Sequence, residues 1–240
     1  MSQAQNQLIR PPAPDDGQHP LVGAFQAFVR RSEFPCVGAK SAMGKGQMKF
    51  VVARDFRSSW DDLRIYAALL EFAGAYRRDP KIFQSLVVLF EATSSLSEAA
   101  FEQTLWTRLQ SFADKDAWYG QSYDERVSPN PQSPHFSLSF GGEAFFVVGL
   151  HPNASRAARR FSNPALVFNP HDQFERLRDQ DRYEGLRASI LARDVALTGS
   201  PNPMLARHGE VSEARQYSGR AVAPDWVCPF NPPKAPQNDR

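Results

Sequence analysis

The stretch GLHPNASRAARRF, residues 149–161, holds one histidine and three arginines close together. His151 directly follows the apolar run EAFFVVGL and begins a turn, and Arg156, Arg159 and Arg160 come soon after it. The end of a buried strand is where a rigid scaffold meets accessible space, and an imidazole placed there can bind a metal or transfer a proton. A single histidine in such a position is more often structural, so its neighbours decide the interpretation.

The three arginines carry more information than the histidine alone. If residues 155–161 form a helical turn, Arg156 has Arg159 at the i+3 position and Arg160 at the i+4 position, so the three side chains lie near one face. Like charges on one face repel unless acidic side chains or a bound anion compensate for them. Guanidinium groups bind carboxylates through two parallel hydrogen bonds. The stretch is therefore either a solvated basic face near acidic residues or a site for a carboxylate-bearing or dianionic ligand.

Cys36 is a second candidate for chemistry. It lies in SEFPCVGAKSA, where Pro35 fixes the backbone before it and small residues after it let another group approach closely. The side chain is either a small buried hydrophobe or a thiolate that ligates a metal or acts as a nucleophile, helped by the charge of Lys40. Cys228, in DWVCPF, is interpreted as a packing residue. The two cysteines are expected to be free thiols.

Glu91 closes the apolar run SLVVLFE. A carboxylate at the end of a buried strand costs free energy unless it is paired. Glu91 can therefore cap the next helix, pair with an arginine or bind a cationic substrate. A non-haem iron site needs two histidines and a carboxylate, and His151, His171 and Asp172 could form one only if the fold brings them together.

Composition excludes several classes of protein. The chain has 240 residues and a net charge of +2, with no basic tail that would indicate nucleic-acid binding. It contains no glycine fingerprint for a dinucleotide, no phosphate-binding P-loop, no cysteine pair at zinc spacing and no nucleophile elbow. Because no apolar run approaches the roughly 20 residues of a membrane span and the N-terminal residues lack a signal-peptide core, we expect a cytoplasmic protein.

The elements that must position these residues follow from apolar periodicity. The pattern predicts helices over residues 21–31, 58–80, 94–117 and 170–197, strands over residues 47–56, 83–93 and 164–170, and a hairpin over residues 133–150. We expect Ser59 to cap the second helix, Ser95 with Glu98 to form a capping box on the third, and Asn169 to cap the fourth. Gly141-Gly142 predicts a primed turn in the hairpin.

This order of elements favours an α+β protein: one domain over residues 21–230, with a mostly antiparallel sheet and helices on one face. An α/β sheet is the alternative, since the early helices and strands alternate. Residues 1–20 and 231–240 are polar and proline-rich, and we expect disordered tails there. The sequence also leaves open a homodimer formed through an exposed sheet edge.

Four stretches in this order, FPCVGAKSA, GLHPNASRAARRF, VFNPHDQFERLR and WVCPF, together resemble the YqcI/YcgG family. The resemblance runs from about residue 21 to residue 230, nearly the whole predicted domain. Members of that family with a known function are haem-dependent enzymes that hydroxylate a guanidine nitrogen, in arginine or in the precursor of guanitoxin. The resemblance therefore implies haem b, O2 as co-substrate, a small guanidine or amine substrate, and an external electron donor or reductase.

The resemblance also implies roles for the residues above. We expect His151 to ligate the iron and the arginines at 156, 159 and 160 to bind the haem propionates. Cys36 is the rival ligand, because a thiolate favours O–O cleavage. The substrate guanidinium needs a carboxylate, for which Glu91 is the first candidate, followed by Asp172 and Glu175. The other hypotheses are a non-catalytic haem protein, such as a sensor or carrier, and a haem-free protein that binds a carboxylate or phosphate ligand.

Overall fold

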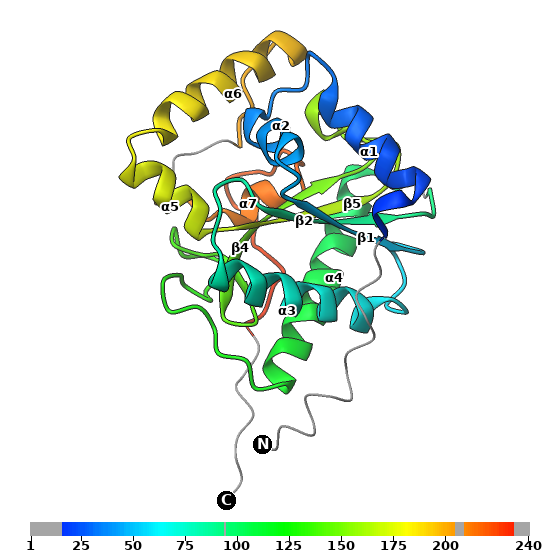
Figure 1. The fold of residues 1–240 in the computed structure, drawn as a ribbon, viewed down its shortest axis with the longest axis vertical. Helices are drawn as coiled ribbons and strands as arrows, with labels where there is room; N and C mark the ends of the chain where they lie inside the picture. The colour runs from blue at the N-terminus through cyan, green and yellow to red at the C-terminus, as the bar shows by residue number, and fades with distance from the viewer. Residues whose placement is uncertain (1–15, 94, 205–208, 233–240) are drawn as a thin grey trace, which may run out of the picture.

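The apolar runs pair into one five-stranded sheet in the computed structural model, which describes residues 16–93, 95–204 and 209–232 (Figure 1). The strands are β1 (Met48–Ala53), β2 (Ser85–Phe90), β3 (Leu138–Phe140), β4 (Glu143–Leu150) and β5 (Ala165–Pro170). Their order is β1-β2-β5-β4-β3, with β1 and β2 parallel and the remaining neighbours antiparallel. The predicted α+β class, with a mostly antiparallel sheet, is confirmed.

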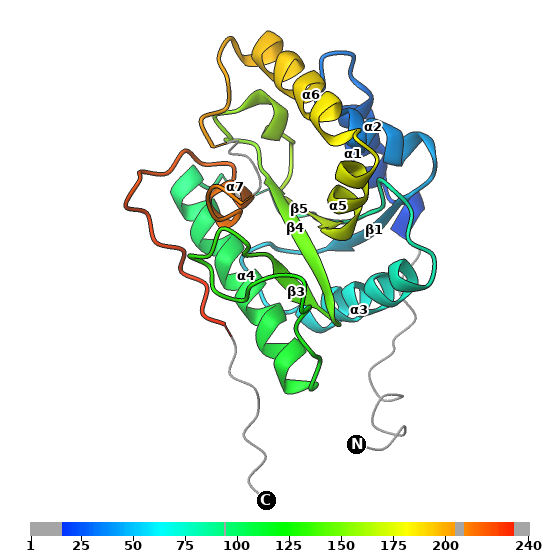
Figure 2. The same ribbon diagram turned by 90° about the vertical axis from the view of Figure 1, so that its left-hand side faces the viewer.

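Helices cover both faces of this sheet. They are α1 (Pro20–Arg30), α2 (Val37–Gly44), α3 (Asp62–Arg78), α4 (Glu98–Trp118), α5 (Asp172–Asp179), α6 (Tyr183–Thr198) and α7 (Ala214–Tyr217), with short 3-10 turns η1 (Asp16–Gln18) and η2 (Ala157–Arg159). In Figure 1, α1, α2 and α6 lie above the sheet and α3 and α4 below it, and the turned view of Figure 2 shows the same division. The expectation of helices on one face is therefore wrong. All six residues of β2 are buried, and such a continuous apolar strand needs cover on both sides.

Two apolar cores follow from the alternation of side chains along the strands. Val88 and Phe90 of β2 join the core with α3 and α4, whereas Val87 and Leu89 join the core with α1. Successive residues of a strand point to opposite faces of the sheet. Each face of the sheet therefore has its own core. The face to which a strand residue points decides which core or cavity its side chain reaches.

The hairpin turn is as predicted, but the helix caps differ. Gly141 and Gly142 both have positive φ, 59° and 75°, as a primed two-residue turn requires. Ser97 rather than Ser95 caps α4, accepting a hydrogen bond from the Ala100 N–H at 3.2 Å.

The other two predicted caps are also wrong. Helix α3 begins at Asp62 with no side-chain cap, so Ser59 does not cap it. Asn169 is still part of β5, and its Oδ1 accepts a hydrogen bond from Ser85 Oγ at 2.7 Å. In each case a residue of the expected type stands near the boundary, but the helix begins several residues later.

Helix α2 is absent from the predicted elements. Its segment contains Gly38 and Gly44 and no apolar periodicity, so its sequence resembles a loop. The N-cap residue is Cys36, a residue type outside the usual capping set.

The outer edge of β1 is partly covered by the chain itself. Asp16, in η1, accepts a hydrogen bond from the Val52 N–H at 2.8 Å and pairs with Arg64 at 2.7 Å. Residues 16–20, which the sequence assigns to a tail, are thus part of the described fold, while residues 1–15 and 233–240 lie outside the described residues. Across the ranges described, no helix is both long and apolar enough to cross a membrane.

Candidate functional site

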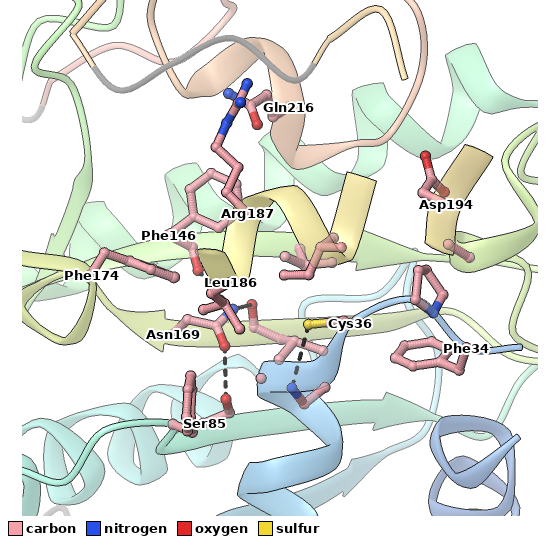
Figure 3. Close-up of a pocket in the computed structure, with 18 of the residues that line it drawn as sticks. Phe34, Cys36, Ser85, Phe146, Asn169, Phe174, Leu186, Arg187, Asp194 and Gln216 are labelled. Carbon is pink, nitrogen blue, oxygen red and sulfur yellow. Dashed lines mark hydrogen bonds between the residues drawn. The ribbon is translucent and has the colours of Figure 1, made fainter. Parts of the chain in front are cut away.

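A cavity of about 320 Å³ lies between the sheet and α6 (Figure 3). Strand residues on this side of the sheet include Ser85, Phe146, Val148, Leu150, Val167 and Asn169. Aromatic rings from other elements also line the cavity: Phe25, Phe34, Phe83 and Phe174. Cavities of roughly 300–1,000 Å³ with mostly apolar walls and a few polar groups are typical of small-molecule and cofactor sites.

Helix α6 borders the cavity with apolar side chains. Leu186, Ile190 and Leu191 line it and are half-buried. The one fully buried residue of α6 is Asp194, which is charged. The apolar residues of a helix normally pack on a core, but here they face a cavity, which suits an apolar ligand.

Cys36 places its sulfur in the wall of this cavity. As the N-cap residue of α2, it accepts a hydrogen bond at Sγ from the Ala39 N–H at 3.4 Å. Burial raises the pKa of the Cys36 thiol, while the first amides of α2 and the charge of Arg159 act in the opposite direction. Helix N-terminal amides and nearby cations stabilise a thiolate. A metal that displaces the thiol proton would therefore find a supported sulfur ligand.

The wall beside Cys36 is shaped by Phe83. Its φ of 73° is unusual for a bulky residue and costs about 1–2 kcal/mol. The Phe83 N–H donates to Gln173 Oε1 at 2.7 Å, which holds this conformation. A side chain at Gly38 would bring its Cβ within 3.3 Å of the Phe83 ring. The close packing of Gly38 on Phe83 fixes the start of α2 and with it the position of the sulfur.

The three arginines do not share one face. Residues 157–159 form the 3-10 turn η2, and only Arg156 and Arg159 line the cavity. Arg160 instead donates from Nε to the Ala154 carbonyl at 3.0 Å and holds its own loop. The expected role of Arg160 in ligand binding therefore does not fit this arrangement.

Arg156 is paired within the protein. It forms an ion pair with Asp194 of α6 and donates to Thr198 Oγ1 at 2.8 Å. The pair ties η2 to α6 across one end of the helix. Arg156 thus holds α6 over the cavity, and its charge is largely compensated.

Arg159 has a different environment. Its guanidinium donates to three main-chain carbonyls, those of Gly149 at 3.0 Å, Tyr217 at 3.1 Å and Gln216 at 2.9 Å. No carboxylate of the described residues lies within ion-pair distance of it. Burial lowers the pKa of Arg159 to about 10, and the charges of Asp194 and Cys36 act in the opposite direction. Arg159 therefore stays charged at neutral pH and offers a cation to an anionic ligand in the cavity.

His151 lies on the opposite face of the sheet from the cavity. Phe146, Val148 and Leu150 of β4 line the cavity, and His151 follows in the alternation. Its ring stacks on Phe101 of α4 with centroids 4.2 Å apart, and the residue is 2% exposed. Burial lowers the pKa of His151 to about 4, so the imidazole is neutral. The expected role of His151 as a ligand to iron in this cavity does not fit its position.

The three predicted acidic residues also lie elsewhere. Glu91 is half-exposed and approaches His19 at 3.4 Å, outside the cavity. Asp172 and Glu175 border a second cavity of about 190 Å³. Its lining consists of Arg126, Val127, His135, His171, Asp172 and Glu175. None of the three predicted acidic residues can hold a cationic ligand in the main cavity.

Two carboxylates that the sequence did not mark do line the main cavity. They are Asp194 of α6 and Glu213, the N-cap residue of α7. Asp194 lies within a regular helical pattern, and Glu213 lies in a region of turn formers, so neither carries a local signal. Cys228 is buried in the core with α4, as expected of a packing residue, and both cysteines are free. Over the ranges described, no group of three or more His, Cys, Asp or Glu side chains could hold a metal ion, so a non-haem iron site of His151, His171 and Asp172 is not formed.

Comparisons with known proteins match most of the chain. The model of the YqcI/YcgG family matches residues 25–231, a span that includes every residue lining the main cavity. The uncharacterized protein YcgG of Bacillus subtilis (strain 168) is 26% identical over 208 residues, which cover 82% of this chain and 81% of YcgG. The uncharacterized protein YqcI of the same strain is 26% identical over 155 residues, covering 62% of this chain and 59% of YqcI. No solved structure gives a significant match. The chain belongs to the YqcI/YcgG family.

Proposed function

We propose that the main cavity binds haem, with Cys36 as the protein ligand to iron, and that the protein N-hydroxylates a guanidine group. One observation carries the proposal: the Cys36 sulfur lies in the wall of a single apolar cavity (Figure 3), and Arg159 lines the same cavity. Haem is a flat apolar ring that needs an axial donor and has two anionic propionates. The cavity offers a sulfur donor, aromatic and aliphatic walls, and a cation whose hydrogen bonds go only to carbonyls.

The residues that line the cavity then have defined roles. Cys36 would hold the metal, with the amides of α2 supporting its negative charge. Arg159, and Arg156 where its pair with Asp194 allows, would bind the propionate carboxylates. Bound haem supplies the activation of O2, and a thiolate ligand favours O–O cleavage. Leu186 and its apolar neighbours on α6 would exclude water from the reacting atoms.

The substrate carboxylate proposed here differs from the one expected from sequence. A guanidinium substrate needs an acidic partner inside the cavity, and Asp194 and Glu213 are the carboxylates that line it. Glu91 is excluded from this role because it lies outside the cavity. Electrons must come from a separate donor, since the chain has no flavin or dinucleotide motif.

The test is binding and turnover with L-arginine as the probe. The chain is expressed with a haem precursor, and absorption spectra are recorded before and after L-arginine is added. We expect a Soret band that L-arginine shifts, then substrate-dependent O2 consumption and N-hydroxyarginine when a reductant is supplied. A Soret band without either response to arginine or to related guanidines would indicate a non-catalytic haem protein instead.

A haem-free binding protein is the second candidate. It is favoured by Arg159, since a guanidinium bonded only to carbonyls serves any carboxylate ligand equally well. Calorimetric titration of the purified protein with arginine-derived and simple carboxylates distinguishes a haem-free binding protein from a haem-dependent one. Binding of such a ligand by protein that takes up no haem would support it.

A further inference from the structure

A buried histidine connects the two cavities. His171 Nε2 lies 3.3 Å from Glu213 Oε1, and Glu213 lines the main cavity. On the other side, His171 Nδ1 lies 3.9 Å from Glu175 Oε1. The side chains of His171 and Glu213 are 7% and 10% exposed, whereas that of Glu175 is 45% exposed. The three side chains form a series of contacts that begins at Glu175, passes His171 in the second cavity and reaches Glu213 in the main cavity.

The backbone fixes this line. The His171 N–H donates to the Ala144 carbonyl at 2.8 Å, which anchors the residue at the end of β5. Glu213 is the N-cap residue of α7 and accepts a hydrogen bond from Ser137 Oγ at 3.4 Å. The histidine and the inner carboxylate therefore come from segments held by the sheet rather than from free loops.

We propose that Glu175, His171 and Glu213 form a proton path that supplies the main cavity from solvent. Imidazole can accept a proton at one ring nitrogen and release one from the other, which suits a group placed between two carboxylates. The proposal rests on the proposed function, because that reaction consumes protons inside the cavity. In it, O2, two electrons, two protons and a guanidine N–H give a guanidine N–OH and water. The external donor supplies the electrons, and the path supplies the protons.

Glu213 is better placed for this task than the other carboxylate of the cavity. Asp194 is paired with Arg156, which ties it to η2. Glu213 Oε1 lies 3.3 Å from His171 Nε2, so it has an imidazole beside it. Proton transfer needs a neighbouring group that can accept a proton on one side and release one on the other, and the two ring nitrogens of an imidazole allow this.

Other charged groups face the path and belong to its description. Arg178 pairs with Glu175 on α5, and Arg126 and His135 border the second cavity beside His171. Arg126 is bonded to Asp172 at 3.1 Å and to Asp124 and Glu143. These charged groups set the electrostatic potential around the path, so the test substitutions leave them unchanged.

The binding of cyanide tests the path without turnover. Hydrogen cyanide is mostly neutral at pH 7 and must give up its proton before the anion binds ferric iron, so an acceptor in the cavity speeds binding. We compare haem-loaded wild type with Glu213→Gln and His171→Asn by stopped-flow absorption. Glu184→Gln is the matched control, because Glu184 is exposed on α6 and does not line the cavity.

The expected result is a rate of cyanide association at least about tenfold lower in both path variants, with the control unchanged. The Soret spectrum of each variant shows whether its haem site is intact, and the arginine-induced shift is an added check for His171→Asn only, because Glu213 is itself a candidate substrate carboxylate. In turnover, the path variants should also release more peroxide per O2 consumed. Intact spectra with unchanged cyanide rates in both variants would overturn the path and leave the proposed function standing. Wild-type protein that takes up no haem would overturn both.

Discussion

The imidazole of His151 stacks on the phenyl ring of Phe101, with the two planes 18° apart. This contact places the histidine in the core with α4, on the face of the sheet opposite the cavity that contains Cys36. The residue that sequence favours as the iron ligand thus lies in the core, whereas Cys36 lines the candidate cavity. The predictions below follow from this division of the sheet into two faces.

Replacing His151 with Phe should leave haem uptake unchanged and reduce the pH dependence of stability. The pKa of His151 falls from 6.5 to about 4 on folding, so the unfolded chain binds a proton more readily. Wild type should be fully stabilised above pH 6.5 and lose up to about 3 kcal/mol as the pH falls toward 4. Urea unfolding at pH 8 and pH 5 measures this loss. A His151→Phe variant that unfolds as wild type does at both pH values, or that loses haem, would contradict the placement of a neutral His151 in the core.

Arg159 and Arg160 should differ sharply despite their adjacency. Arg159→Met removes a cation that lines the cavity and has no carboxylate partner among the described residues, whereas Arg160→Met removes only contacts within its own loop. We expect the affinity for haem, or for a carboxylate ligand, to fall by about tenfold or more in the first variant, since charge-assisted hydrogen bonds contribute about 1.5–3 kcal/mol. Ligand titration by absorption or calorimetry gives the dissociation constant of each variant. Equal effects in both variants would show that Arg159 has no special role.

Two glycines should respond in opposite ways to alanine. A Cβ at Gly149 would lie 2.7 Å from Leu105 Cδ1 and 2.8 Å from Phe101 Cε1, so Gly149→Ala should cost about 1–3 kcal/mol of unfolding free energy. Gly23 lies within α1 with nothing within 4 Å of such a Cβ, and Gly23→Ala should add about 0.5–1 kcal/mol. Thermal or urea unfolding of the two variants shows whether each substitution lowers or raises the free energy of unfolding. A tolerated Gly149→Ala would mean that α4 does not pack on β4 as closely as described.

Asp116→Asn should stabilise the protein at neutral pH. Burial raises the pKa of Asp116 from 3.8 to about 6, which penalises the charged form in the folded state. The penalty is absent below pH 3.8, grows as the pH rises to 6 and stays constant above it, at roughly 2–3 kcal/mol. Asn keeps an oxygen for the two hydrogen bonds that Oδ1 accepts, from Tyr66 Oη and the Gly141 N–H, both at 2.8 Å. The unfolding free energy of Asp116→Asn should therefore exceed that of wild type only above about pH 4, which measurements between pH 4 and pH 8 would show.

The fold class could be predicted from sequence because the signals are local. The hairpin at Gly141-Gly142 and the periodic helices that became α1, α3 and α4 have strong patterns within single segments. Helix α2 was missed because Gly38 and Gly44 lower its intrinsic helix propensity and its cap is a cysteine. The second layer of helices could not be foreseen from any one segment, since it depends on how the strands pair.

The site could be predicted only in part, for the same reason. The motif around His151 follows the end of β4, whose last residue, Leu150, lines the candidate cavity, and alternation places His151 and Leu150 on opposite faces. Which face holds the cavity depends on where α6 packs, and no local pattern specifies that. Glu213 and Arg159 are far apart in sequence, and only the tertiary fold brings both to the cavity.

The most direct test of the central claim is the absorption spectrum of the haem-loaded protein after reduction and addition of carbon monoxide. Wild type and Cys36→Ser are compared, with Cys228→Ser as the control because Cys228 is buried outside the cavity. Serine can still cap α2, so the fold should survive the first substitution. We predict the red-shifted Soret band of a thiolate ligand in wild type and in the Cys228 variant, and its loss in Cys36→Ser. A histidine-type spectrum that is the same in all three proteins would contradict the account.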